Sequence, residues 1–342
     1  MTVSVVIAVR NGARTLGRCL DRLAEQTLHP DEVIVVDNGS RDGSGDLARG
    51  FAARAQHLRL RVLEEDRTGA TFARNRGVAA ASGDLVAFTD ADCEPAADWL
   101  DRLTSAFRPG IGAVAGRIKP APPKTVVEAF AALYTLRTGE EPFDSTRFTL
   151  LRGGFATANL VVRRDVFTAI GGFDEGIRIY GEDYDLCARI YRLGRVIRYE
   201  PQAVVLHHHR TTLRGLLRQS FHFGACHAYL LRRHFRRKVL IELPLTSWDR
   251  DDLPGRIWLD LASADKKLIG LWGLAGWLPW LWWLPVGYFA YLYVDACRRF
   301  RREIFPIPRG ARLAAPGLLL AKSAAMTAGR LVGSARYRAV CL

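Results

Sequence analysis

Two aspartates with one residue between them, Asp90 and Asp92, directly follow an apolar run that is typical of a buried strand. In extended backbone, residues i and i+2 point to the same side of the chain. Two carboxylates at that spacing can hold a hard divalent cation, and a diphosphate on the far side of the ion would complete its coordination. We therefore predict a metal site at Asp90 and Asp92, although short acidic patterns of this kind also occur in ordinary polar loops.

A second acidic pair, Glu182 and Asp183, follows Gly181 and precedes a predicted helix over residues 184–193. Acidic side chains are favoured at helix N-termini by the helix dipole, so this pair has a purely structural explanation. It also has a chemical one, because a positioned carboxylate can accept a proton from a hydroxyl group. The residues alone leave both explanations open.

Basic side chains follow further along the chain. Three consecutive histidines, His207 to His209, come after a short predicted strand, and such a run is compatible with a plain surface. Arg214 and Arg218 lie four residues apart on a predicted helix, so they share one of its faces. Because arginine forks match phosphate oxygens, these two are candidate contacts to a diphosphate or to a lipid phosphate.

The elements that must position these residues alternate between strand and helix. Apolar runs predict strands, and helical spacing predicts the helices between them, at residues 3–9, 15–26, 32–37, 46–55, 58–63, 71–81 and 84–89. This order predicts an α/β fold with a mostly parallel sheet, in which ligands bind beyond the carboxyl ends of the strands. Asp37 ends the second strand and Asp90 follows the fourth, so we expect them at one edge of the sheet.

Composition narrows the class of protein. The chain has 342 residues and a net charge of +14, with arginines concentrated after residue 208, which fits either nucleic acid or an anionic membrane surface as a partner. The six cysteines include no close pair, which argues against a zinc ribbon or a disulfide framework and fits a reducing cytoplasm. Residues 1–9 lead directly into a strand, so we expect no secretory signal.

Residues 268–294 contain five tryptophans and no charged residue. The run is long enough to cross a bilayer, but Pro279 and Pro285 interrupt it. A single pass would separate the basic residues on its two sides, against the tendency of basic flanks to stay in the cytoplasm. A hairpin or re-entrant segment would keep both flanks on one side. Two passes, with residues 311–332 returning, and a buried appendage or oligomer contact are the alternatives.

Several blocks of the sequence resemble family 2 glycosyltransferases of the GT-A fold. The opening VSVVIAVRNGARTLGRCLDRLAEQTL and EVIVVDNGSRDGS are similar to that family's first blocks, and RTGATFARNRGVAAASGDLVAFTDADCEP is similar to its middle block. GGFDE and GEDYDLCARIYRLG resemble its acceptor-side block. The resemblance runs from about Val3 to about Gly224, in the family's order. No G-x-G-x-x-G pattern follows the first strand, which argues against a dinucleotide site.

The resemblance implies a binding site for a nucleotide-sugar donor at the edge of the sheet. Ala8 and Arg10, at the end of the first strand, would line the pocket for the base. Asp37 would bind the uracil or the ribose. Arg74 and Asn75 would face the nucleotide or its diphosphate.

The same resemblance assigns the acidic residues to metal binding and proton transfer. Asp90 would contact ribose or metal, and Asp92 would ligate the metal, which is Mn²⁺ or Mg²⁺. Asp183 would be the base that takes the proton of the acceptor hydroxyl, and Glu182 would orient the acceptor or its loop.

A histidine completes the metal site in some GT-A enzymes, at an interval from the base similar to that from Asp183 to His207. We therefore expect His207 as a ligand, with His209 as the alternative. Imidazole suits manganese better than magnesium.

Together these features predict a GT-A domain with a Rossmann-like, mostly parallel sheet at residues 1–224. A basic, helical, hydrophobic and membrane-associated region would follow at residues 225–342. The expected reaction is inverting sugar transfer to a hydroxyl of a lipid-linked acceptor, in cell-envelope glycan or glycolipid synthesis at the cytoplasmic face of the cell membrane. The segment LRQSFHFG lacks the tryptophan of the processive synthases' Q-x-x-R-W motif, which counts against a polymerase.

Three alternatives belong to other classes of function. A non-catalytic basic α/β module would bind nucleic acid through its arginines, and a degenerate scaffold would bind without turnover. A nucleotidyltransferase would also combine an α/β sheet with paired carboxylates. The intact acidic pairs argue against the first two, and the lack of a glycine-rich basic loop near the first strand argues against the third.

Overall fold

The computed structural model describes residues 1–136, 139–151, 153–177 and 180–342. The chain forms two compact units, each built from two stretches of sequence. The first unit comprises Met1–Ala121 and Leu136–His208, and the second comprises Pro122–Thr135 and His209–Leu342. The sequence-based boundary at residue 224 stays a prediction; it lies inside helix α8 (Leu213–His234), whereas the last change between the two compact units falls between His208 and His209.

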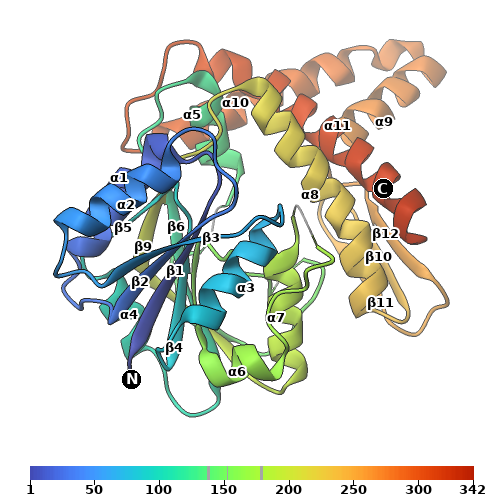
Figure 1. The fold of residues 1–342 in the computed structure, drawn as a ribbon. Coiled ribbons are helices and arrows are strands. Elements are labelled where there is room, and N and C mark those ends of the chain that lie inside the picture. The colour runs from blue at the N-terminus through green and yellow to red at the C-terminus, as the bar shows by residue number, and fades with distance from the viewer. Residues whose placement is uncertain (137–138, 152, 178–179) are drawn as a thin grey trace. The chain divides into compact units, whose positions relative to one another are not determined.

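The first unit begins with the predicted alternation of strands and helices. The elements are β1 (Val3–Val9), α1 (Ala13–Ala24), β2 (Glu32–Asp37), α2 (Ser44–Arg54), β3 (Leu60–Glu64), α3 (Ala70–Ala80) and β4 (Leu85–Thr89). β1 pairs in parallel with both β2 and β4, and β2 pairs in parallel with β3 (Figure 1). Because every connection contains a helix, the carboxyl ends of these strands meet at one edge of the sheet.

The remaining strands of the first unit extend the same sheet beyond β4. The sheet order is β3-β2-β1-β4-β8-β6-β9-β5, with β7 paired to β9. β8 runs antiparallel to β4 and β6, so the sheet is mixed although mostly parallel at its centre. The elements are β5 (Cys93–Pro95), α4 (Trp99–Ser105), β6 (Ile111–Pro120), β7 (Phe143–Ser145), β8 (Asn159–Arg163), α6 (Arg164–Ala169), α7 (Glu182–Arg192) and β9 (Val196–His207).

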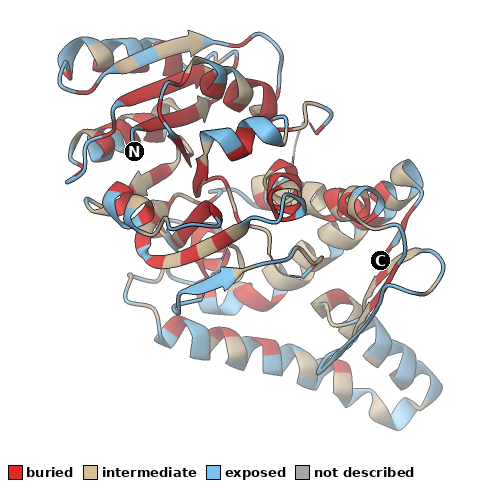
Figure 2. Ribbon diagram, turned by 90° about the horizontal axis from the view of Figure 1, so that it is seen from below, coloured by how far each residue is buried: buried red, intermediate tan, exposed pale blue. Residues whose placement is uncertain are grey.

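The central strands are buried on both faces, as their uninterrupted apolar sequence predicts. Val5 and Ile7 of β1 belong to one core cluster, together with Leu16 and Leu20 of α1. The intervening Val6 points to the opposite face and belongs to a second cluster. The two clusters thus lie on opposite faces of the sheet, and Figure 2 draws buried residues in red.

The second unit contains both helices and a small sheet. Strands β10, β11, β12 and β13 form a four-stranded sheet that the sequence analysis did not predict. Its strands are short, and β13 comes from the far end of the chain, so no local alternating pattern marks the sheet. The elements are α5 (Val126–Tyr134), α8, β10 (Lys238–Glu242), β11 (Ser247–Arg250), β12 (Arg256–Asp260), α9 (Ala264–Trp277), η1 (Pro279–Leu281), α10 (Trp283–Arg301), α11 (Ala311–Tyr337) and β13 (Val340–Cys341).

Helices α8 and α11 pack closely because both carry glycine at the contact. A Cβ atom at Gly224 would lie 2.0 Å from the Met326 carbonyl oxygen, and one at Gly329 would lie 1.9 Å from that of Phe221. Any larger residue at either position would force the helices apart. These glycines therefore set the distance between the two longest helices of this unit.

Of the alternatives for residues 268–294, a transmembrane helix is wrong, whereas the break at Pro279 that a hairpin requires is present. The structure divides this run into α9, η1 and α10, since proline cannot continue the hydrogen bonding of a helix interior. Among the residues that the structure describes, no helix combines the length and the apolarity needed to cross a membrane. The C-terminal region is thus helical in part, but it contains no long apolar helix.

Candidate functional site

The carboxyl ends of β1, β2 and β4 bring the predicted donor-site residues to one edge of the sheet. Val9 of β1 lies beside Asp37 of β2 in the parallel register, and Asp90 directly follows β4. Ala8 is half-buried at the end of β1, and Arg10 beyond it is exposed. The parallel pairing of β1 with β2 and β4 places Asp37 and Asp90 at this edge, as predicted.

Asp37 is held in position by its own turn. Its Oδ1 accepts a hydrogen bond from the Ser40 amide at 3.0 Å. A Cβ atom at Gly45 would lie only 2.5 Å from its Oδ2, so glycine at the start of α2 leaves the space that this carboxylate occupies. The half-buried Asp37 carboxylate therefore has a defined direction at the end of β2.

Arg74 connects the two acidic pairs that the sequence analysis singled out. From the interior of α3, its Nη1 donates to Glu182 Oε1 at 2.8 Å and its Nη2 donates to Asp90 Oδ1 at 2.8 Å. Only 7% of the Arg74 side chain is exposed, against 30% for Asp90 and 11% for Glu182. Burial alone would lower the pKa of Arg74, but the charges of both carboxylates and the hydrogen bonds to them outweigh it and raise that pKa. Arg74 is therefore a permanently charged bridge.

The role expected of Arg74 and Asn75, to face the nucleotide or its diphosphate, stays a prediction, and the two side chains have different partners in the structure. Consecutive residues of a helix point about 100° apart, so the two side chains diverge. Asn75 Nδ2 donates to the Phe173 carbonyl at 2.9 Å, and its Oδ1 accepts from the Phe173 amide at 2.8 Å. Asn75 thus holds the segment before α7, and Arg74 holds the acidic residues.

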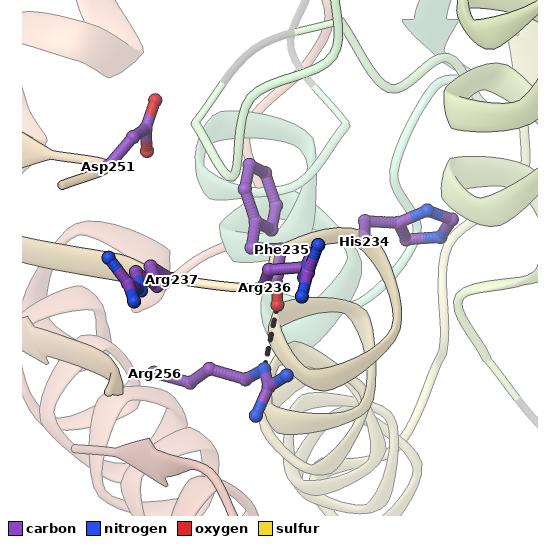
Figure 3. Close-up of a pocket in the computed structure, with 6 residues that line it drawn as sticks. All are labelled: His234, Phe235, Arg236, Arg237, Asp251 and Arg256. Carbon is purple, nitrogen blue, oxygen red and sulfur yellow. Dashed lines mark hydrogen bonds between the residues drawn. The ribbon is translucent and has the colours of Figure 1, made fainter. Parts of the chain in front are cut away.

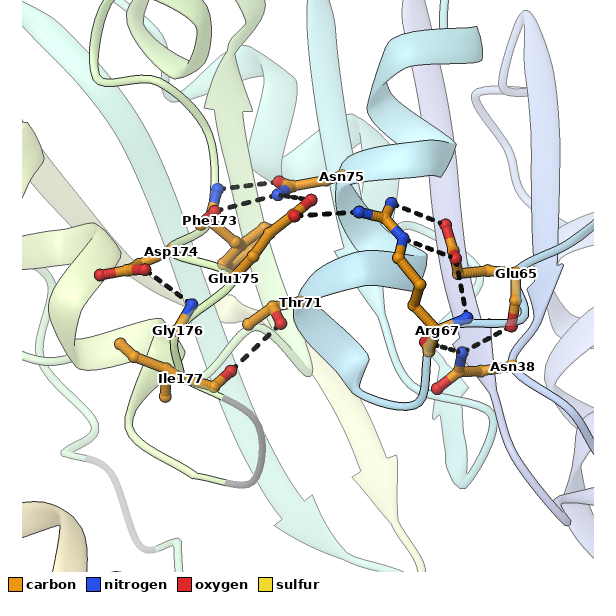
Figure 4. A network of polar contacts seen from close by, with 10 residues as sticks. All are labelled: Asn38, Glu65, Arg67, Thr71, Asn75, Phe173, Asp174, Glu175, Gly176 and Ile177. Atoms are coloured by element: carbon orange, nitrogen blue, oxygen red, sulfur yellow. Dashed lines mark hydrogen bonds and ion pairs between the residues drawn. The ribbon is translucent and has the colours of Figure 1, made fainter.

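A network of polar contacts fastens that segment, residues 173–177, to α3 (Figure 4). Arg67 donates to Glu65 and to Glu175 Oε2, both at 3.0 Å, and so links β3 to the segment. Thr71 Oγ1 donates to the Ile177 carbonyl at 3.1 Å. Asn38, at the end of β2, donates to the Glu65 and Arg67 carbonyls at 2.8 Å, which holds the loop before α3.

Asp183 lies next to the bridge, at the start of α7. The helix begins after Gly181, whose φ of 97° is favourable for glycine. Burial and then the negative charge of Glu182 raise the pKa of the Asp183 carboxyl to about 7. Because Glu182 is engaged by Arg74, Asp183 is the member of this pair with the properties of a proton acceptor near neutral pH.

Asp92 and His207 are brought together by strand pairing. β5 runs antiparallel to β9 with Cys93 opposite His207, and Asp92 immediately precedes β5. Asp92 Oδ1 lies 3.6 Å from His207 Nε2. Ligand atoms of Asp92, Cys93 and His207 all lie within 4.8 Å of one another. Sequence reasoning missed Cys93, since only the register of β5 and β9 reveals that it faces this cluster.

The donor set fits a hard divalent ion. Two ligand atoms that each lie about 2.1–2.2 Å from one Mn²⁺ or Mg²⁺ ion must be no more than about 4.4 Å apart, which the separation of Asp92 and His207 satisfies. Burial and the nearby aspartates raise the pKa of the Cys93 thiol well above its usual value, so Cys93 is a neutral thiol in the metal-free protein. A carboxylate with an imidazole suits manganese.

The other predicted basic residues lie elsewhere. His208 Nε2 lies 2.6 Å from Glu94 Oε1, and Arg18 lies 3.5 Å from the same oxygen, so this histidine belongs to a polar cluster around Glu94. His209 is the first residue of the second unit's longer stretch. Arg214 and Arg218 are exposed on α8 in that unit, and their role as phosphate contacts stays a prediction.

The second unit contains a basic cavity of about 620 Å³ (Figure 3). Arg256 Nε donates to the Phe235 carbonyl at 2.7 Å, while the only acid of the lining, Asp251, pairs with Lys238 at 2.8 Å. The net charge of the lining therefore suits an anion, but the cavity contains none of the acidic residues described above. It is lined by His234, Phe235, Arg236, Arg237, Asp251 and Arg256.

Comparisons with known proteins agree on one family. The model of glycosyl transferase family 2 matches residues 4–171. The chain is 31% identical over 227 residues to the glycosyltransferase AglE of Haloferax volcanii, covering 65% of this chain and 71% of that protein. It is 35% identical over 241 residues to the pre-mycofactocin glycosyltransferase of Mycobacterium tuberculosis, which is 68% of this chain but only 48% of the relative.

A solved structure shares the fold over nearly the whole chain. It is the mannosyltransferase PcManGT from Pyrobaculum calidifontis in complex with GDP-Man and Mn²⁺. The TM-score is 0.58 at 21% sequence identity, and the match covers 97% of this chain and 86% of that one. At this identity the likeness concerns the fold, which is that of GT-A enzymes.

Replacing Arg74 by methionine should destabilise the protein by about 3 kcal/mol, since it leaves two acidic side chains facing each other without their cation. Urea denaturation measures the change in the free energy of unfolding. Arg102→Met is the matched control, because Arg102 forms an exposed pair with Asp98 and its loss should cost about 1 kcal/mol or less. Equal losses in the free energy of unfolding would show that the buried bridge stabilises the protein no more than an exposed ion pair does.

Replacing Asp92 by asparagine should weaken Mn²⁺ binding at least about tenfold, because it removes one charged ligand. The melting temperature should change little, since Asp92 lies outside the apolar core clusters. Calorimetric titration with Mn²⁺, alone and with UDP or GDP, measures the binding. Asp98→Asn is the control, because the Asp98 carboxylate is partly exposed and pairs with Arg102 away from the proposed metal site. Unchanged Mn²⁺ affinity in Asp92→Asn would remove this residue from the metal site.

Proposed function

Since the chain belongs to glycosyl transferase family 2, we propose that it moves a sugar from a nucleoside-diphosphate sugar to an acceptor hydroxyl with inversion at the anomeric carbon. One observation carries the proposal. The raised pKa of Asp183 occurs beside a fixed bridge that joins Glu182 to Asp90, only two residues from Asp92. A candidate base and a candidate metal site are thereby tied to the same arginine.

In the proposed reaction, Asp183 accepts the proton of the acceptor hydroxyl while that oxygen forms its bond to the anomeric carbon. The bond between the anomeric carbon and the diphosphate oxygen breaks, and the electron pair leaves with the nucleoside diphosphate. A carboxyl with a pKa of about 7 suits this step, because it is substantially ionised at neutral pH and still binds a proton well.

The donor would be held at the edge of the sheet described above. Asp37, Ala8 and Arg10 would contact the nucleoside, and Asp90 would contact its ribose or the metal. Asp92 and His207 would hold Mn²⁺ or Mg²⁺, which when bound stabilises negative charge on the departing diphosphate. The PcManGT structure, with its GDP-Man and Mn²⁺, supports a nucleotide-sugar donor and a divalent ion as the requirements of this chain.

The rival classes receive no support from this site. A basic module that binds nucleic acid would leave the buried Arg74 bridge without a role, and a degenerate scaffold would not need a carboxyl with a raised pKa. A nucleotidyltransferase belongs to neither the matching family nor the matching relatives.

The place of action that we propose is the cytoplasmic face of the cell membrane, in the synthesis of a cell-envelope glycan or glycolipid. The acceptor would then be a lipid-linked hydroxyl compound. The support is the uncharged, tryptophan-rich run at residues 268–294, together with the basic residues on both sides of it.

Replacing Asp183 by asparagine should lower kcat by about a hundredfold to ten-thousandfold, because the amide cannot take the hydroxyl proton. Donor affinity should stay within about threefold, since different residues hold the nucleotide and the metal. Thermal shift with a panel of nucleotide sugars and Mn²⁺ first identifies the donor, and turnover and calorimetry then measure the two effects. Asp101→Asn, on the exposed face of α4, is the control. Full turnover in Asp183→Asn would assign the base to another residue.

The wild-type rate should also depend on pH in a defined direction. The pKa of Asp183 is raised, so the carboxyl is protonated and inactive as a base below about pH 7 and ionised above it. We expect kcat/KM to fall about tenfold per pH unit below that value and to level off above it. The residual kcat/KM of Asp183→Asn should not show this fall below about pH 7. A profile that is flat between pH 5 and 8 would contradict the assignment.

A further inference from the structure

The uncharged run at residues 268–294 is mostly exposed in the second unit. Ile269 and Leu274 of α9 and Val286 and Phe289 of α10 are exposed large apolar residues. Five tryptophans, Trp272, Trp277, Trp280, Trp282 and Trp283, are 53–79% exposed. Large contiguous apolar surfaces of this kind are rare on proteins that face only water. We refer to residues 268–294 as the tryptophan hairpin.

The tryptophan hairpin is not the core of its own unit. Of its residues, only Ala275, Pro285 and Leu292 are buried. The ends of α9 and α10 outside it are the parts anchored to the unit. Asp265, near the start of α9, accepts hydrogen bonds from Ser323 and Thr327 of α11 at 2.6 and 2.7 Å. The apolar part therefore projects from a fixed base.

The two helices turn back on themselves. The three-residue η1 joins α9 to α10, and the two helices contact each other as well as α11. Basic residues stand at both ends of the hairpin: Lys266 and Lys267 before it, and Arg298, Arg299, Arg301 and Arg302 after it. The chain reverses at η1, and the uncharged residues lie between the two basic groups in the sequence.

The uncharged part of α9, residues 268–277, has the length of half a bilayer. At about 1.5 Å per residue, these ten residues span about 15 Å, against about 30 Å for the hydrocarbon core of a membrane. A hairpin of this length enters one leaflet and returns without crossing. This agrees with the finding that no helix among the described residues can span a membrane.

We infer that the tryptophan hairpin inserts into one leaflet of a membrane that contains anionic lipids, whose headgroups bind the basic residues that flank it. Tryptophan favours the boundary between hydrocarbon and headgroups, and each cation near an anionic surface adds about 1 kcal/mol of attraction. The helical backbone satisfies its own hydrogen bonds in lipid. The inference deepens the proposed membrane location and rests on it.

A second copy of this chain is the competing occupant. A symmetric contact through the tryptophan hairpins would also bury the apolar side chains. However, residues 268–294 contain no acidic residue to meet the arginines of the other copy, and Asp295, which follows them, already pairs with Arg299 at 2.7 Å. Anionic lipid supplies the missing negative charge, so the charge pattern favours a membrane over a dimer.

Flotation of the full chain with vesicles tests the inference. We expect strong binding to phosphatidylcholine vesicles that contain about a third phosphatidylglycerol, and at least about tenfold weaker partitioning for Trp277→Ser/Trp280→Ser. Trp248→Ser is the matched control, because Trp248 is 44% exposed on β11 of the same unit, outside the hairpin. Arg298→Gln/Arg301→Gln should reduce binding to anionic vesicles and leave binding to pure phosphatidylcholine unchanged.

The depth of the tryptophans in the bilayer and the oligomeric state of the protein distinguish membrane insertion from dimer formation. Tryptophan fluorescence should be quenched by lipids brominated on their acyl chains. Wild-type protein that stays unbound with both vesicle types would overturn the inference, as would a dimer in sedimentation equilibrium that only the hairpin variant dissociates. Calorimetry with Mn²⁺ and UDP or GDP in detergent should be unchanged in both double variants. A protein that floats but never binds nucleotide would instead contradict the proposed transferase function.

Discussion

Arg74 joins two acidic clusters that lie about ninety residues apart in the sequence, and the candidate site depends on this bridge. Without the guanidinium, Asp90 and Glu182 would face each other as like charges with little water to screen them. The bridge also fixes where Asp183 lies, because Glu182 and Asp183 are neighbours at the start of one helix. One buried cation thus sets the separation between the metal side and the base side of the site.

The parallel sheet supplies the other constraint. β1, β2 and β4 end at the same edge, so the residues at their carboxyl ends lie close together although they are far apart in the sequence. The antiparallel pairing of β5 with β9 then adds His207 to Asp92. The fastening of residues 173–177 to α3 completes the arrangement, since it holds the chain just before α7. The strands and α3 therefore determine where the candidate site residues lie.

The second unit is built from packed helices and a small sheet, and it exposes a large amount of apolar side chain to the surface. Glycine contacts pack α8 against α11, and a small sheet closes the far end of the chain. This leaves the tryptophan hairpin with most of its side chains exposed. We propose a lipid leaflet as the environment of this apolar surface, because its helices are too short for a full crossing.

Much of the first unit was determined by the sequence alone. Buried strands in a parallel sheet are continuous apolar runs, and the strands at residues 3–9 and 32–37 were predicted with the bounds that the structure has. Asp37, Asp90 and Asp92 were found because they stand at such strand ends. The alternation of strand and helix then implied their convergence, since local patterns are enough to establish the order of these elements.

Only the tertiary structure decided which side chains meet. The partners of Arg74, the place of Asn75 on the Phe173 backbone and the approach of Cys93 to His207 all join residues far apart in sequence. The small sheet of the second unit escaped prediction for the same reason, whereas the prolines of residues 268–294 already suggested a hairpin. Composition measures how apolar a segment is, but packing and chain reversal determine whether it crosses, inserts or is buried.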